Sequence, residues 1–136
     1  DGKDLNFLKE LVLKLTLEDR IQFLGRVVQE EVQQLLLKAD CTIINSNFET
    51  FSMVALESIL TGCPVICTSC GGPEQFINKS NGLLINTNDY NALAKAMVEM
   101  YQNKLNYPPE LVRKSVVNTY SKDSIRKQLN TIYDSI

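Results

Sequence analysis

The sequence predicts an α/β fold in which a parallel β-sheet carries helices on both faces. Short runs of apolar and β-branched residues alternate with longer stretches in which apolar residues recur at helical spacing. This alternation is typical of strand–helix–strand units, whose parallel strands are covered by the connecting helices. A chain of 136 residues, 44% of them apolar, can fill one ordinary core, so we expect a single domain over residues 1–136.

The first half of the chain shows the patterns of both element types. Apolar residues at helical spacing mark helices at 5–15, 30–38 and 53–60. Ile21–Leu24 is a short strand candidate, and Cys41–Ile44 is β-branched and bounded by polar residues, which favours a buried strand. The helix at 53–60 is apolar almost all round, so we expect it to be buried in the layer that covers the sheet.

The second half continues the alternation. Apolar runs predict strands at 65–67 and 82–85. Asp89 begins a helix that continues to about Gln102, with four residues facing inward: Leu93, Ala96, Met97 and Met100. Pro108 and Pro109 begin the next helix. Ser121 caps a final helix over about 122–133, within a C-terminal helical segment at 121–136.

Charge and hydropathy exclude several classes of protein. The formal net charge is -2, and the basic residues are scattered along helical stretches. Binding to a phosphate backbone needs a clustered excess of Lys and Arg, so no nucleic-acid partner is expected. No apolar run approaches the roughly 20 residues that span a bilayer, and no signal-peptide pattern opens the chain. We therefore expect a cytoplasmic protein, with a peripheral position on the cytoplasmic membrane face as an option for the full-length protein.

The four cysteines fit a core better than a metal or redox centre. Cys67 and Cys70 have the C-x-x-C spacing of metal and redox pairs, but the chain has no His, and Cys41 belongs to a separate strand-like segment. Cys63 and Cys67 lie at the two ends of a short extended run. We expect reduced thiols that serve as small core or loop residues.

The loop and helix from Asn45 to Gly62 carry most of the functional information. Parallel sheets bind ligands at the carboxyl ends of their strands, and the polar loop 45–52 follows such an end. The helix that begins near Met53 offers unpartnered backbone N–H groups and the positive end of its dipole, which suit an anion such as a diphosphate. The alternative is that Ser52 acts as an ordinary N-cap for the same amides.

Two glutamates lie on either side of this helix start. Glu57 follows Met53 by one turn on an otherwise apolar helix, where a carboxylate is costly unless it is hydrogen-bonded. Helical side chains lean toward the N-terminus, so Glu57 is placed to bind two vicinal ribose hydroxyls, and Glu49 can bind hydroxyls of a sugar. The alternatives are that Glu49 is a solvated loop residue and that Glu57 pairs with a nearby Lys or Arg.

Four segments along the chain form an ordered set of motifs. They are the strand and loop Asp19-Arg20-Ile21-x-Phe23-Leu24-Gly25-Arg26-Val27, the E-x7-E segment Ser46-x-x-Glu49-x-Phe51-x-x-Val54-x-Leu56-Glu57-x-x-x-x-Gly62-x-Pro64-Val65-Ile66, the loop Gly71-Gly72-Pro73-Glu74 and the strand Asn81-Gly82-Leu83-Leu84. With these motifs, in this order, the chain resembles the family 4 glycosyltransferases over nearly its whole length. The ordered set is far more specific than a pair of glutamates.

The resemblance implies a retaining GT-B enzyme with two Rossmann-like domains, of which this chain would be the C-terminal, donor-binding one. The implied reaction moves a hexose-type sugar from a nucleotide-diphosphate sugar to an acceptor. By resemblance, Glu57 binds the ribose and Glu49, the candidate catalytic residue, contacts the transferred sugar. The other donor-binding candidates are Gly25, Arg26 and Val27, against the nucleobase, and Thr50, Phe51, Ser52 and Met53, where backbone amides around the last three face the diphosphate or the sugar.

No metal or other cofactor is expected. In the resembled family, amides and basic side chains neutralise the leaving diphosphate, and this chain has no Asp-x-Asp motif. Two departures from the family pattern stand out. Thr50 and Ser52 occupy positions where many members have glycine. In the family, a basic pair and the first two strands of the domain come before the residues that match Asp1-Gly2.

These departures imply either a fragment of a larger protein, inactive by itself, or a sheet that closes in an unusual way. The carbohydrate or lipid-linked acceptor would then bind the N-terminal domain, which is missing from this sequence. Three other readings remain open: a nucleotide-sugar epimerase or phosphorylase on the same scaffold, a non-catalytic donor-binding half, and a regulatory domain like response-regulator receivers. The last needs an acidic cluster at the strand ends, where this chain has Asn45-Ser46 and Thr68-Ser69.

Overall fold

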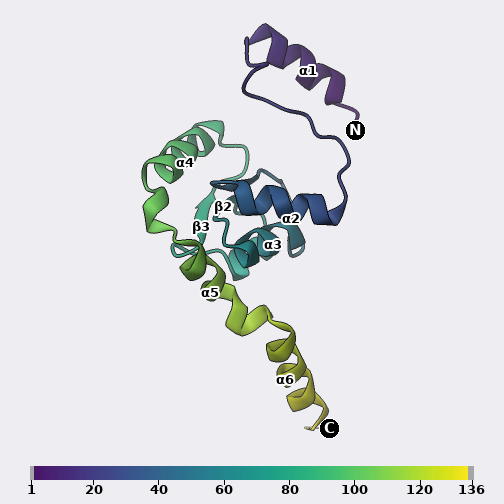
Figure 1. The fold of residues 1–136 in the computed structure, drawn as a ribbon, viewed down its shortest axis with the longest axis vertical. Helices are drawn as coiled ribbons and strands as arrows, with labels where there is room; N and C mark the ends of the chain where they lie inside the picture. The colour runs from purple at the N-terminus through teal and green to yellow at the C-terminus, as the bar shows by residue number, and fades with distance from the viewer. Residues whose placement is uncertain (1, 135–136) are drawn as a thin grey trace. The chain divides into compact units, whose positions relative to one another are not determined.

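The computed structural model describes residues 2–134 and forms two compact units, Asp1–Val32 and Gln33–Ile136 (Figure 1). Asp1, part of the predicted turn at the start, lies outside the described residues, as do residues 135 and 136 of the predicted C-terminal segment. None of the described helices is long and apolar enough to cross a membrane.

The N-terminal unit contains one complete helix and an irregular connection. Helix α1 (Leu5–Lys14) forms where predicted, but none of its residues is buried within the described part of the chain. The strand predicted at Ile21–Leu24 is wrong, because these residues adopt no regular structure. A strand is stable when a neighbouring strand accepts and donates its backbone hydrogen bonds, and no strand in residues 2–134 pairs with this segment.

Helix α2 (Gln29–Lys38) leads into the second unit, where three parallel strands form the sheet. The strands are β1 (Thr42–Ile44), β2 (Val65–Thr68) and β3 (Gly82–Ile85), in the order β1-β2-β3. Ile43 pairs with Ile66, and Ile66 pairs with Leu83. All three occur where the sequence predicts them.

The helices of the second unit cover both faces of this sheet, as predicted. Alternate residues of a strand point to opposite faces. Val65 and Cys67 join the core formed with α3 (Met53–Thr61) and α5 (Pro109–Tyr120), whereas Ile66 packs with Ala96 and Met100 of α4 (Tyr90–Gln102). Figure 1 shows α3 and α4 on different sides of the strands.

Three burial predictions are wrong. The segment Cys41–Ile44 is not fully buried, because β1 has a described neighbour on one side only and Ile43 is 42% exposed. Helix α3 is buried on one face only, which contains Leu56 and Ile59, and Met53 and Val54 are at least half exposed. Met97 of α4 is 47% exposed, because Ala96 and Met100 define the face that packs on the sheet.

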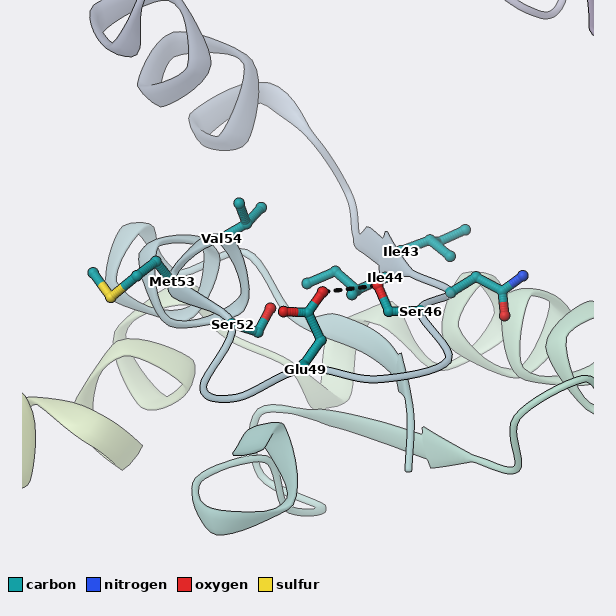
Figure 2. A pocket seen from close by; sticks show the side chains of 8 residues that line it. Ile43, Ile44, Ser46, Glu49, Ser52, Met53 and Val54 are labelled. Carbon is teal, nitrogen blue, oxygen red and sulfur yellow. Dashed lines mark hydrogen bonds between the residues drawn. The ribbon is translucent and has the colours of Figure 1, made fainter. Parts of the chain in front are cut away.

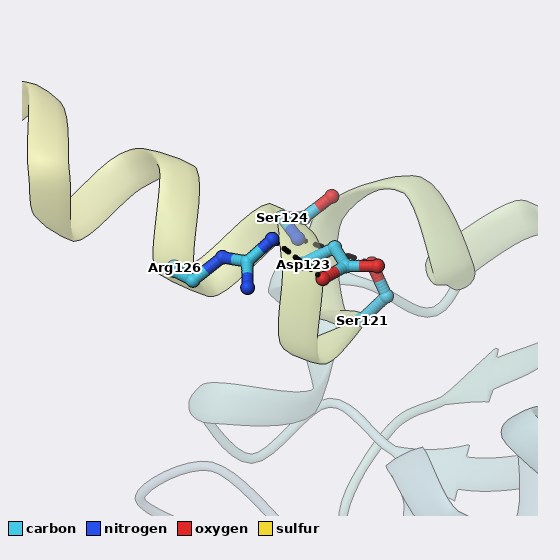
Figure 3. Close-up of polar contacts among 4 residues, drawn as sticks. All are labelled: Ser121, Asp123, Ser124 and Arg126. Atoms are coloured by element: carbon cyan, nitrogen blue, oxygen red, sulfur yellow. Dashed lines mark hydrogen bonds and ion pairs between the residues drawn. The ribbon is translucent and has the colours of Figure 1, made fainter.

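The C-terminal helix α6 (Lys122–Tyr133) begins at the predicted cap. The hydroxyl of Ser121 accepts a hydrogen bond of 3.2 Å from the amide of Ser124, and Arg126 pairs with Asp123 at 3.1 Å (Figure 3). No described residue of α6 is buried. Two short 3-10 helices, at Gly72–Gln75 and Lys104–Asn106, complete the unit.

The cysteines are core residues. Cys63, Cys67 and Cys70 are buried, all four thiols are free, and no group of metal-binding side chains occurs among residues 2–134. Burial, and then the neighbouring Cys70, raises the pKa of Cys67 to about 12. Burial also raises the pKa of Cys41 to about 11. These two thiols are therefore protonated at neutral pH and lack the nucleophilic thiolate form.

Candidate functional site

A pocket of about 350 Å³ lies where β1 ends and α3 begins (Figure 2). This is the carboxyl end of a parallel strand, the position where such sheets bind ligands. The pocket combines apolar walls from the strand and the helix with polar groups of the connecting loop. Its lining consists of Ile43, Ile44, Asn45, Ser46, Glu49, Ser52, Met53 and Val54.

The carboxylate of Glu49 is held within this pocket. The hydroxyl of Ser46 donates a hydrogen bond of 2.8 Å to Glu49 Oε1, as Figure 2 shows. The backbone carbonyl of Ser46 in turn accepts a hydrogen bond from the hydroxyl of Thr68, on the adjacent strand β2. The side chain of Glu49 is therefore oriented by a chain of contacts that leads back to the sheet.

The backbone of Glu49 is fixed from the other side by the glycine turn after β2. The Glu49 amide donates to the carbonyl of Cys70 at 3.1 Å, and the Gly72 amide donates to the carbonyl of Glu49 at 2.9 Å. Glu49 and Gly71 thereby form an isolated parallel bridge. Glu74 braces the turn, since its Oε1 accepts from the Gly71 amide at 2.9 Å.

This contact requires glycine at Gly72. A Cβ atom there would lie 2.2 Å from the carbonyl oxygen of Thr50 and 2.4 Å from the Cα of Phe51. Gly71 has φ 117, and a Cβ on it would lie 2.8 Å from the carbonyl oxygen of Glu49. The Gly-Gly pair noted in the sequence thus allows the close approach of two backbones that sets the position of the pocket loop.

Helix α3 begins without a capping side chain. Ser52, the N-cap residue, has φ 67 and ψ 78, and its side chain makes no capping hydrogen bond. The alternative that Ser52 is an ordinary N-cap is therefore wrong in this structure. The first amides of a helix have no intrahelical acceptor, so this end of α3 presents donors and positive dipole charge to the pocket.

Phe51 anchors the loop in the core. Its ring lies 5.2 Å from that of Phe76 and 5.7 Å from that of Tyr120, measured between ring centroids. Such contacts between aromatic rings hold the backbone on either side of Phe51. The side chain of Phe51 therefore packs in the core and is not part of the pocket lining, and the contact of its backbone with a ligand stays a prediction.

The predicted site residues divide into two groups. Glu49, Ser52 and Met53 line the pocket. The half-buried Glu57 lies four residues after Met53 and three residues after Val54, which places it on the same side of α3 as these two pocket residues. Thr50 is exposed and its side chain does not contribute to the lining. Gly25, Arg26 and Val27 belong to the N-terminal unit, where Gly25 has φ 69, and their assignment to the nucleobase stays a prediction.

Sequence reasoning assigned no site role to Ser46, to the strand residues Ile43 and Ile44, or to the glycine turn. A signal was available for the strand end, because the carboxyl ends of parallel strands supply ligand contacts. The contact between Gly72 and the Thr50 carbonyl joins segments about 20 residues apart, and nothing in the local pattern of either segment predicts it.

Comparison with known proteins shows the family to which the chain belongs. The model of the family described as glycosyl transferases group 1 matches residues 1–122, and the chain belongs to that family. N-acetyl-alpha-D-glucosaminyl L-malate synthase of Bacillus anthracis is 32% identical over 136 residues, which cover 98% of this chain and 35% of that enzyme. The chain thus spans about a third of the length of such relatives.

Solved structures confirm the predicted fold class, a Rossmann-like α/β half of a GT-B fold. Sucrose-phosphate synthase from Thermosynechococcus elongatus superimposes with a TM-score of 0.85 at 27% identity, over 98% of this chain and 34% of that one. HepE from Anabaena, solved in complex with UDP, superimposes with a TM-score of 0.84 at 24% identity, over 98% of this chain and 38% of that one.

Proposed function

We propose that this chain forms the donor site of a retaining, family 4 type glycosyltransferase that moves a hexose from a nucleoside-diphosphate sugar. One observation carries the proposal: the uncapped start of α3 and the oriented Glu49 carboxylate line the same pocket. Helix amides suit the oxygens of a diphosphate, and a fixed carboxylate suits the hydroxyls of a sugar. A nucleotide sugar carries both groups in one molecule.

Each part of the donor has a proposed place along the chain. The diphosphate occupies the start of α3, where the amides around Phe51, Ser52 and Met53 donate to its oxygens. Glu57, one turn further along the helix, binds the ribose hydroxyls, and Glu49 contacts the transferred sugar. The segment Gly25–Val27 contacts the nucleobase, the role that the family resemblance implies for it.

The reaction proposed here needs no metal. The helix dipole and backbone amides stabilise the charge that develops on the leaving diphosphate, and positive groups elsewhere in the full-length protein complete that role. The acceptor, a carbohydrate or a lipid-linked sugar, binds a domain that relatives carry in the part of their length that this chain does not span. Residues 1–136 alone therefore bind nucleotide weakly and transfer sugar negligibly, and the full-length enzyme acts in the cytoplasm.

Replacement of Glu57 tests the ribose assignment. Loss of a charged hydrogen bond costs about 1.5–3 kcal/mol, so Glu57→Ala in the full-length protein should weaken nucleotide binding about 10- to 100-fold. Isothermal titration with UDP, GDP and ADP and their glucose or mannose derivatives measures the effect. Glu110→Ala, an exposed helical glutamate on α5, serves as the matched control and should leave binding unchanged.

Two outcomes contradict the proposal in different ways. Equal binding by Glu57→Ala and by the unaltered protein would remove the ribose assignment. Absence of binding for every nucleotide sugar in the panel, by a folded full-length protein, would remove the donor site itself.

A further inference from the structure

The first half of the pocket loop is held by the segment that follows β2. The Glu49 amide donates to the Cys70 carbonyl at 3.1 Å, and the Gly72 amide donates to the Glu49 carbonyl at 2.9 Å. Both are bonds between backbone groups, which residues of many other types could also make. The hydroxyl of Thr68 donates a further bond to the carbonyl of Ser46. Of these three bonds, this is the one that depends on a particular side chain.

The hydroxyl of Thr68 serves the loop rather than the packing of the sheet. Thr68 is the last residue of β2 and is 1% exposed. A valine has a similar shape and would bury no polar group there, so packing alone does not account for a hydroxyl. Its possible acceptors are the carbonyl of Ile44, at 3.5 Å, and the carbonyl of Ser46, which is much closer. Ser46 is therefore its main acceptor.

Ser46 passes this restraint on to Glu49. Its hydroxyl donates to Glu49 Oε1 at 2.8 Å, as Figure 2 shows, so holding the backbone of Ser46 also holds the group that orients the carboxylate. Threonine is a suitable anchor because its branched Cβ restricts the rotation of the hydroxyl. Asn47 and Phe48, between the two pocket residues, are exposed, so burial does not fix this part of the loop.

The second half of the loop is held independently. The ring of Phe51 packs against the rings of Phe76 and Tyr120, and the start of α3 follows directly. The backbone at Ser52 and Met53 is thus anchored by the aromatic core rather than by the end of β2. A change at Thr68 should therefore act on Glu49 and leave the amides at the start of α3 in place.

We propose that Thr68 is a positioning residue of the donor site, a role that rests on the proposed function for the identity of the ligand. Its hydroxyl holds Ser46, and through Ser46 it keeps the Glu49 carboxylate in the orientation that binds the transferred sugar. Without this bond the carboxylate samples several orientations. Binding must then select one of them, which lowers the affinity for the sugar.

Two variants of Thr68 separate its hydroxyl from its shape. Thr68→Val removes the donor, and in the full-length protein it should bind the cognate ligand among UDP-glucose, GDP-mannose and ADP-glucose about fivefold more weakly, the effect of one ordinary hydrogen bond. Thr68→Ser keeps the donor and should recover most of the affinity. Both should bind the matching free UDP, GDP or ADP as the unaltered protein does. Isothermal titration measures these affinities, and an equal loss for the free diphosphate would overturn the proposal.

Thr42→Val is the matched control, since it makes the same substitution at the start of β1, away from the pocket. The hydroxyl of Thr42 bonds the hydroxyl of Ser58 at 2.8 Å and the thiol of Cys63 at 3.4 Å. This variant should lower the melting temperature about as much as Thr68→Val does and keep its affinity for the sugar nucleotide. Equal losses of affinity in the two variants would show a general effect of destabilising the sheet, and the positioning role would be wrong.

A double variant tests whether Thr68 acts through Ser46. Combined with Ser46→Ala, Thr68→Val should bind the sugar nucleotide about as weakly as Thr68→Val alone, because the carboxylate is already free. Residues that act through one shared contact show such non-additive effects. If the two losses of affinity multiply instead, Thr68 acts on the ligand by another route and the proposal fails.

Hydrogen exchange in the unliganded full-length protein gives a readout that needs no ligand. Peptides that cover residues 45–49 should exchange about fivefold faster in Thr68→Val, whereas those that cover α3 should not change. Unchanged exchange at 45–49 would overturn the positioning role. Faster exchange there, in a protein whose unaltered form binds no sugar nucleotide, would support the restraint on the loop and remove the proposed function instead.

Discussion

Two strand-to-helix connections of this protein follow β1 and β3, the two outer strands of the described sheet, and end in opposite ways. After β3, Asp89 caps α4, since its carboxylate accepts a hydrogen bond of 2.8 Å from the amide of Ala92. After β1, Ser52 begins α3 at φ 67 and makes no capping bond. Helix α6 follows the first pattern, with Ser121 as its cap (Figure 3).

The difference between a capped and an uncapped helix start indicates which of the two junctions can bind a ligand. Where a capping side chain accepts hydrogen bonds from the first amides of a helix, those amides need no ligand as an acceptor. The cap then stabilises the fold. The start of α3 has no capping side chain and its serine has a positive φ, and the loop before it is held by the Gly71–Gly72 turn. In a protein, a feature that lowers stability at one such junction and not at the other indicates function.

The largest expected effect concerns the glycine turn. Gly72→Ala places a methyl group 2.2 Å from the Thr50 carbonyl oxygen, and it should lower the free energy of unfolding by about 2–3 kcal/mol. The shift it forces on Glu49 should also weaken binding of the sugar nucleotide about tenfold or more, because small displacements of binding groups are costly. Denaturant unfolding and calorimetric titration measure the two effects.

Gly82→Ala is a matched control for this variant. Its added methyl group would lie 2.2 Å from the carbonyl oxygen of Val65, which is the same degree of overlap between β2 and β3 and away from the pocket. It should lose comparable stability and keep its ligand affinity. If both variants lose affinity to the same degree, the glycine turn has no positioning role beyond its part in folding.

The capped junction should respond in stability alone. Asp89→Ala removes the N-cap of α4 and should lower the free energy of unfolding by about 1 kcal/mol, the usual value for such a cap. Affinity for the sugar nucleotide should not change. A loss of affinity would show that the two connections are not as different as their structures indicate.

The smallest effect is expected at Ser46. Ser46→Ala removes the hydroxyl that donates to Glu49 Oε1, and the freer carboxylate should bind the sugar nucleotide about threefold more weakly, the effect of one ordinary hydrogen bond. Titration of the sugar nucleotide measures it. Ser80→Ala, which removes an exposed hydroxyl bonded to Asn78, should show no change.

Much of the fold could be predicted because it is encoded locally. The capped start of α4, the proline start of α5 and the cap of α6 at Ser121 all lie where the sequence places them. The strand expected at Ile21–Leu24 could not be predicted in this way, since a strand depends on a partner strand that local pattern does not specify, and no described strand pairs with this segment. For the same reason the exposure of Ile43 was missed.

The amino-acid sequence by itself determined the types of the elements, the parallel sheet and the region of the site. It could do so because helical periodicity, β-branched runs and capping residues act over a few neighbouring positions. Tertiary structure alone decided how that region is arranged. The contact of Gly72 with the Thr50 carbonyl, the hydrogen bond from the Thr68 hydroxyl to the Ser46 carbonyl and the one from the Glu49 amide to the Cys70 carbonyl depend on how separate segments meet. Such contacts form only when the chain closes on itself, and so no local pattern records them.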